Sequence, residues 1–233
     1  MKARVEESTE FRNRQYVFED RTDAGKALGL MLAPGYSGAE DVMVLAIPSG
    51  GVPVALKVCE KLKCPMDLII VRKLQIPGNP EAGFGALTGE GSFFLNNELL
   101  ARLRLSGDQI EKEKTKVGEE LEKRNKLFRG GKPFPDLQNK RVILVDDGLA
   151  SGYTMMASLF EVRSKGAAVA AVAVPTAPLD SIRRIENGAD EIYCANIREG
   201  PFFAVAGAYE NWYDLSQEEV LNLLQKQAGF PTP

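Results

Sequence analysis

The sequence contains no histidine, and this absence limits the chemistry open to the chain. Histidine is the commonest general base near neutral pH and the commonest protein ligand of transition metals. Acid–base chemistry in this chain must therefore use carboxylates, lysines, tyrosines or water.

Cysteine is also scarce. The chain has 3 cysteines, Cys59, Cys64 and Cys194, and no CxxC motif. An odd number without paired spacing suggests neither a disulfide framework nor a four-thiolate zinc site. We expect all of them to be core or near-core thiols.

Long apolar runs and a strong charge excess are missing as well. No stretch of 18 apolar residues occurs, and the N-terminal segment is polar and acidic where a signal peptide is apolar. The net charge of -3 and the pI of about 5.3 give no electrostatic footprint for nucleic acid. We therefore expect a soluble, cytoplasmic protein with no nucleic-acid partner and no membrane partner.

Apolar, mostly β-branched runs predict the strands. Their continuous apolar character is typical of strands buried on both faces of a parallel sheet. Together with the helical patterns between them, they predict an α/β fold with a doubly wound, mainly parallel five-stranded sheet. The runs cover residues 42–47, 67–72, 141–146 and 168–175, with a weaker fifth at 190–195.

Helical patterns alternate with these runs. Ser106 with Gln109, and Ser216 with Glu219, form capping boxes at predicted helix starts. Helix 106–128 is rich in lysine and glutamate, and we interpret it as a solvated helix with i,i+4 ion pairs rather than a polyanion site. Gly166 and Gly188 stand where left-handed residues would end helices. The predicted helices cover residues 52–62, 106–128, 153–165 and 178–187.

Two segments do not follow the alternation. Residues 75–96 are rich in glycine and contain two short strand-like pieces joined by residues 89–91, which predicts a hairpin in a flexible loop. Long glycine-rich excursions in compact domains often act as lids. Residues 196–214 are rich in aromatic residues and have no clear period.

The segment after strand 141–146 carries the clearest chemical signal. The strand ends in Asp146 and Asp147, and a small-residue loop with Gly148 and Gly152 leads into a helix. Ligands of open α/β sheets bind at the carboxyl ends of strands, and the free N–H groups at a helix start attract phosphate. The two glycines permit close backbone approach. The loop is therefore a predicted phosphate site.

The acid pair needs a second group to bind, because carboxylates repel phosphate. Two adjacent acceptors suit the cis-hydroxyls of a ribose, with Mg²⁺ held by Asp146 and Asp147, directly or through water. A Walker A motif is absent, residues 83–89 depart from GxGxxG, and a receiver domain needs its acid pair after the first strand. A structural reading, an N-cap beside a solvated acid, stays open. The predicted ribose-phosphate residues are Asp146, Asp147, Gly148, Leu149, Ala150, Ser151, Gly152, Tyr153 and Thr154.

This segment resembles the signature of type I phosphoribosyltransferases, in which a strand, two acids and a loop such as G-L-A-T/S-G-x-T open a helix. FEDRTDAGKALG, IPSGGVPVA and EGPFFAVAGAYENW also resemble a bacterial and archaeal branch of predicted phosphoribosyltransferases with no assigned acceptor. The resemblance covers roughly residues 18–195. It implies a single domain, 1–233, with a core at 18–195, a flexible loop at 75–96 and a C-terminal hood at 196–233.

The resemblance also implies roles for residues outside the phosphate loop. Phosphoribosyl pyrophosphate would bind through a small-residue turn after the first strand and two cations after the second. Phe202 and Phe203 of the hood would face the acceptor base. A homodimer is the implied assembly. The implied pyrophosphate-binding residues are Ser49, Gly50, Gly51, Arg72 and Lys73, and the implied catalytic residues are Asp146, Asp147, Lys73 and Glu81.

One departure from the family leaves the proton transfer open. Purine-salvage enzymes for hypoxanthine and guanine have an acid inside the phosphate loop, where this chain has Ala150. Adenine enzymes of the family share that alanine and use a glutamate of the flexible loop, so Glu81 is our candidate, with Glu90 as an alternative. The sequence thus predicts transfer of 5-phosphoribosyl to a nitrogenous acceptor. The alternatives are a regulatory protein that senses phosphoribosyl pyrophosphate without transfer, and a hydrolase that uses water.

Overall fold

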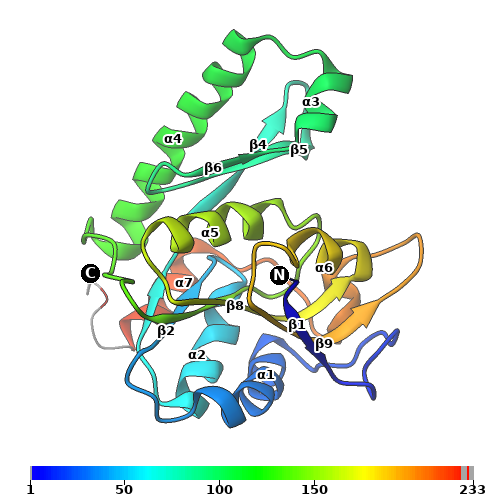
Figure 1. Cartoon of the computed structure of the whole chain (residues 1–233), viewed down its shortest axis with the longest axis vertical. Coiled ribbons are helices and arrows are strands. Elements are labelled where there is room, and N and C mark those ends of the chain that lie inside the picture. Colours follow the sequence, from blue (N-terminus) through cyan, green and yellow to red (C-terminus); the bar gives the residue numbers. More distant parts are fainter. Residues whose placement is uncertain (1, 227–229, 231–233) are drawn as a thin grey trace.

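The computed structural model of the 233-residue chain describes residues 2–226 and residue 230, without the side chains of residues 80–82. A layered α/β core and a projecting arm make up the molecule (Figure 1). No described helix is both long enough and apolar enough to cross a membrane.

The core is built on a sheet of 6 parallel strands, which confirms the predicted α/β class. Its strands are β1 (Arg4–Glu7), β2 (Val42–Ala46), β3 (Met66–Leu68), β7 (Arg141–Val145), β8 (Val169–Pro178) and β9 (Glu191–Arg198). They lie in the order β1-β9-β8-β7-β2-β3. The prediction of five strands was wrong because β1 is short and polar, so it gives no apolar run, yet it pairs along β9 at the edge.

Helices cover both faces of this sheet, as the doubly wound prediction requires. They are α1 (Arg21–Tyr36), α2 (Gly51–Leu62), α5 (Tyr153–Ser164), α6 (Leu179–Ile185) and α7 (Gln217–Gln225), with a 3-10 helix, η1 (Val205–Ala208). Successive residues of β7 show the two faces: Ile143 packs in the cluster with α1 and α2, and Leu144 packs in the cluster with α5 and α6. This alternation is the side-chain period of a strand.

The arm contains the segment predicted as a flexible loop. Its elements are β4 (Val71–Ile76), β5 (Asn79–Thr88), β6 (Phe93–Leu95), α3 (Asn97–Leu103) and α4 (Gly107–Arg129). Antiparallel pairing of β5 with β6 confirms the hairpin, and β4 adds a third strand on the other side of β5. Figure 1 shows α4 running the length of the arm.

The predicted second strand, 67–72, is divided between core and arm. Its first part is β3 of the parallel sheet, and its end is the start of β4 in the arm. Buried Arg129, at the end of α4, donates two hydrogen bonds of 2.9 and 3.0 Å to Asp67 and so ties the base of the arm to β3. Because Arg72 and Lys73 belong to β4, they lie in the arm and not at the edge of the core sheet, where they were predicted.

Helix ends follow the sequence closely with one exception. Both capping boxes form, at Ser106 with Gln109 and at Ser216 with Glu219. Gly166 is left-handed (φ +81°) just after α5, as predicted. Gly188 is not among the described residues with positive φ, so the prediction was wrong there. It packs closely instead, since a Cβ on Gly188 would lie 3.4 Å from a methyl carbon of Leu159.

Candidate functional site

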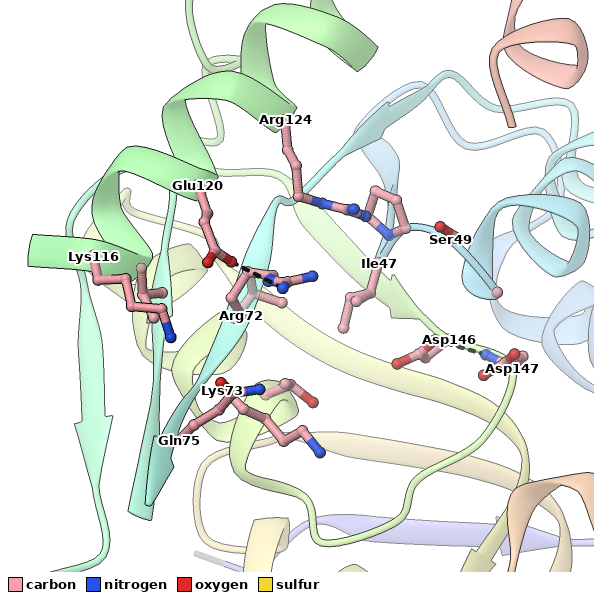
Figure 2. A pocket seen from close by; sticks show the side chains of 15 residues that line it. Ile47, Ser49, Arg72, Lys73, Gln75, Lys116, Glu120, Arg124, Asp146 and Asp147 are labelled. Carbon is pink, nitrogen blue, oxygen red and sulfur yellow. Dashed lines mark hydrogen bonds and ion pairs between the residues drawn. The ribbon is translucent and has the colours of Figure 1, made fainter. Parts of the chain in front are cut away.

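A polar cavity of about 470 Å³ lies where the carboxyl ends of β2 and β7 meet the base of the arm (Figure 2). One wall comes from the loops after β2 and β7, and the other comes from β4 and α4. The lining residues are Ile47, Pro48, Ser49, Gly50, Val71, Arg72, Lys73, Gln75, Lys116, Val117, Glu120, Arg124, Asp146, Asp147 and Thr154.

Two helices begin at this cavity with glycine N-caps. Gly50 precedes α2 and Gly152 precedes α5, and no described side chain caps either helix. Helices α1, α3, α4 and α7 each have a capping side chain instead. The first N–H groups of a helix have no partner within the helix and carry the positive end of its dipole. Both starts are therefore suited to bind an anion.

Close packing or backbone conformation favours glycine at three positions of these loops. A Cβ on Gly50 would lie 1.8 Å from Asp147 Oδ2, and a Cβ on Gly51 would lie 2.6 Å from the carbonyl oxygen of Val145. Gly152 has a φ of +82°, in the left-handed region that glycine adopts without strain. The loop after β2 and the loop after β7 thus hold one another in place.

The acid pair is fixed by the N-terminal helix and the C-terminal segment. Arg21, the first residue of α1, has its Nε 2.9 Å from Asp147 Oδ2, in a pair whose side chains are 8% and 15% exposed. The Arg21 guanidinium also donates to the carbonyl of Tyr213 (2.8 Å) and lies 3.9 Å from the centre of the Trp212 ring. Tyr209 donates its hydroxyl to the carbonyl oxygen of Asp147. Segments distant in sequence therefore position Asp147.

The environment separates the two acids electrostatically. Burial raises the pKa of Asp146 well above its usual range, and the negative charge of Asp147 raises it further. Burial also raises the pKa of Asp147, but the Arg21 cation opposes this shift. Asp146 accepts a 2.9 Å hydrogen bond from the backbone N–H of Asp147. Of the two acids, Asp146 therefore holds a proton more readily, and a bound cation would stabilise its charged form more.

Cations dominate the wall formed by the arm. Arg72 of β4 pairs with Glu120 of α4 at 2.9 Å, and Lys116 and Arg124 of α4 line the same cavity (Figure 2). The predicted exposed face with ion pairs is present, with Lys114 and Glu111 2.9 Å apart, but Lys116, Glu120 and Arg124 form a stripe that lines the cavity. The sequence signal for this stripe is the four-residue spacing of Lys116, Glu120 and Arg124, which places them on one side of the helix, next to the buried Val117.

Comparison with known proteins decides the family. Residues 33–207 match the model of the phosphoribosyl transferase domain. The chain belongs to this family. Two Mycobacterium tuberculosis proteins, from strains CDC 1551 and H37Rv, are each 37% identical over 210 residues and are named as candidate phosphoribosyl transferases. The match covers 90% of this chain and 47% of each relative, so the chain spans about half their length.

Two solved structures share the fold of this chain. The crystal structure of TT1426 from Thermus thermophilus is similar with a TM-score of 0.75 and 34% identity, over 91% of this chain and 99% of that one. The AQ2163 protein from Aquifex aeolicus is 14% identical with a TM-score of 0.51, over 77% of this chain and 75% of that one, and shows likeness of fold alone.

The cavity brings together residues from the predicted ribose-phosphate and pyrophosphate groups. Of the predicted ribose-phosphate residues, Asp146, Asp147 and Thr154 line the cavity, and of the predicted pyrophosphate residues, all but Gly51 do. Residues 148–152 connect the acid pair to α5, and Tyr153 is the first residue of that helix. Their backbone is fixed from several sides, with Leu149 donating to the carbonyl of Thr176 at 2.9 Å. Arg21 was not predicted, although it lies within the FEDRTDAGKALG motif.

The predicted acceptor residues lie apart from this lining. Phe202 is 89% exposed, Phe203 is half-buried, and neither is among the described residues that line the cavity. Glu81 belongs to β5, but its side chain lies outside the described residues. The roles of all of them stay predictions.

Binding of Mg²⁺ at this site would need oxygen atoms from a bound substrate in addition to those of the protein. Among the described residues, no three or more acidic, histidine or cysteine side chains are placed so that they could together hold a metal ion. Mg²⁺ is commonly held by one or two carboxylates together with phosphate oxygens and water rather than by an all-protein cage. Asp146 and Asp147 fit this pattern if the substrate supplies the remaining oxygens.

Proposed function

We propose that this phosphoribosyl transferase transfers the 5-phosphoribosyl group of phosphoribosyl pyrophosphate to a nitrogenous acceptor and releases pyrophosphate. The observation that carries the proposal is the shared cavity. In it, the start of α5, an acid pair and a cationic wall border about 470 Å³. A ligand with a phosphate at one end, a diol in the middle and a diphosphate at the other end matches this order of groups.

Each wall has a separate task in the proposed reaction. The N–H groups at the start of α5 hold the 5-phosphate, together with the hydroxyl of Thr154. Asp146 accepts hydrogen bonds from the ribose hydroxyls, and Asp147, fixed by Arg21, completes this acceptor surface. The N–H groups at the start of α2, with Arg72 and Lys73, hold the diphosphate.

Catalysis in this scheme rests on positioning and charge. The C1–oxygen bond to the diphosphate breaks, positive charge develops on the ribose, and the acceptor nitrogen attacks C1. Cations on the diphosphate stabilise the negative charge that accumulates as it leaves. Bound Mg²⁺ would neutralise further charge on the leaving group. Glu81 is our candidate for removing the acceptor proton.

The direct test measures pyrophosphate release from phosphoribosyl pyrophosphate with Mg²⁺, across a panel of nucleobases and small amines. We expect release that requires one acceptor class and is lost in Asp146→Asn. Binding without release would favour the sensing alternative, and release without any acceptor would favour the hydrolase. Absence of both binding and release would refute the proposal.

A further inference from the structure

One face of α4 closes the pocket with alternating charge. Lys116, Glu120 and Arg124 are four residues apart and therefore lie along one side of the helix. All of them line the cavity, and Figure 2 shows Arg124 extending from α4 toward the segment that carries Ile47 and Ser49. The arm thus reaches the anion-binding side of the core.

Arg124 is incompletely satisfied at this position. Its Nε is buried and has no hydrogen-bond partner among the described residues, and its guanidinium carbon lies 5.0 Å from the centre of the Phe128 ring. Burial lowers the pKa of Arg124, and the nearby Arg72 cation lowers it further. A buried N–H without a partner is costly. An anion in the pocket would relieve both the missing hydrogen bond and the repulsion.

Glu120 supplies a negative charge where a phosphate would be expected. Its Oε2 lies 2.9 Å from Nη2 of Arg72, and the two side chains are 37% and 41% exposed. An ion pair this exposed gains little net free energy and can exchange partners. Phosphate oxygens offer arginine a bidentate partner of higher charge. Glu120 is therefore placed to act as an internal competitor for Arg72.

We propose that α4 forms part of the diphosphate subsite, in which Arg124 binds the diphosphate directly and Glu120 competes with it for Arg72. This inference rests on the proposed function, since it takes the cavity to be the phosphoribosyl pyrophosphate site. It adds a specificity-determining cation and an opposing carboxylate to the residues that the phosphate loops supply.

The first experiment compares three ligands by calorimetry at fixed Mg²⁺: phosphoribosyl pyrophosphate, inorganic pyrophosphate and ribose 5-phosphate. Arg124→Gln should weaken binding of both diphosphate ligands by roughly tenfold or more, the scale of a charged hydrogen bond. Binding of ribose 5-phosphate should be unchanged. Lys123→Gln is the matched control, because Lys123 is an exposed cation on the same helix outside the pocket lining.

The second experiment removes the negative charge of Glu120. Glu120→Gln should strengthen pyrophosphate binding by roughly threefold, since it removes a competitor from a half-exposed pair. Glu119→Gln is the matched control, because Glu119 is exposed and lies outside the pocket lining. Opposite effects from two residues one turn apart on α4 would not arise from general damage to the helix.

The outcomes separate this inference from the proposed function. If the unmodified protein binds none of the three ligands, the proposed function fails and the inference fails with it. If it binds them and Arg124→Gln behaves like Lys123→Gln, the role of α4 is overturned while the proposed function stands. An equal loss of ribose 5-phosphate and pyrophosphate binding in Arg124→Gln would also overturn it, because that pattern indicates a structural effect.

Discussion

Each wall of the pocket contains a carboxylate that is paired with an arginine at the same distance. In the core, Arg21 and Asp147 are 2.9 Å apart with side chains 8% and 15% exposed. In the arm, Arg72 and Glu120 are also 2.9 Å apart, but their side chains are 41% and 37% exposed. Judged by distance alone, the two ion pairs would be equally strong.

Their surroundings give the pairs different roles. Arg21 is also bonded to the Tyr213 carbonyl and lies against the Trp212 ring, so it cannot leave Asp147 without losing other contacts. Arg72 faces the cavity and is more exposed to water, which screens its attraction to Glu120. The core pair therefore holds the acid pair in position, whereas the arm pair can open to admit a ligand.

The largest expected effect comes from breaking the core pair. Arg21→Met should lower the free energy of unfolding by about 3 kcal/mol, because it leaves the carboxylate of Asp147 without its counter-charge in a buried site. Arg72→Met is the matched change in the arm and should cost less than about 1 kcal/mol. Chemical denaturation measures both. Equal losses would show that the two pairs do not differ in the way their burial indicates.

Two helical glycines extend the comparison to backbone packing. Gly51→Ala in α2 should destabilise the protein by about 1–3 kcal/mol, since its Cβ would lie 2.6 Å from the Val145 carbonyl oxygen. Gly118→Ala in α4 should stabilise it by up to about 1 kcal/mol, because the added Cβ would meet nothing within 4 Å beyond the neighbouring backbone of its own helix and alanine favours a helix. Thermal unfolding shows whether each substitution lowers or raises the stability of the protein. A loss at Gly118 would contradict the open environment of α4.

The core wall was predictable from sequence because its signals are local. Asp146, Asp147 and Gly152 lie within one short segment between a buried strand and a helix, and both the resemblance and the physical chemistry point to the same loop. The capping box at Ser106 formed for the same reason. Arg21 was missed because its partner is far away in the sequence, and no local pattern links α1 to the end of β7.

The arm wall was harder to predict because tertiary packing decides it. The apolar run 67–72 contains no signal for the break between β3 and β4, so Arg72 was placed at the edge of the core sheet. The lysines and glutamates of α4 favoured a solvated surface, because their spacing places charges on one side of a helix without showing whether that side faces water or a pocket. Burial of Val117 and Leu121, together with the ion pair of Arg129 with Asp67 at the base of α4, orients the helix so that this stripe faces the site.

The acid pair should give stability a pH dependence with a definite sign. Because the folded-state pKa of Asp146 is raised, the folded protein binds more protons than the unfolded chain. This contribution to stability is complete below the unfolded pKa of about 4 and is lost as the pH rises through the folded pKa. Asp146→Asn should therefore flatten the decline in unfolding free energy above pH ~4. An unchanged slope in ligand-free protein would show that Asp146 is not the proton-binding acid.

The smallest expected change in stability concerns the exposed hood, and it tests whether the site extends beyond the two walls. Phe202→Ala should alter the unfolding free energy by less than about 0.5 kcal/mol, because a side chain that is 89% exposed makes few contacts to lose. If the Phe202 ring stacks on the acceptor, as aromatic rings do on nucleobases at roughly 1–3 kcal/mol per base, acceptor-dependent turnover should nevertheless fall about tenfold. Phosphoribosyl pyrophosphate binding should be unchanged.

Phe160, an exposed phenylalanine on α5 that is 59% exposed and outside the pocket lining, gives the matched control. Phe160→Ala should leave turnover and ligand binding unaltered, so a fall confined to Phe202→Ala would place the acceptor beside the hood. The half-buried Phe203 serves as a second position, since substitution of one ring can be masked by the other. Full acceptor-dependent turnover after replacement of both phenylalanines would rule out a stacking role and restrict acceptor binding to other parts of the chain.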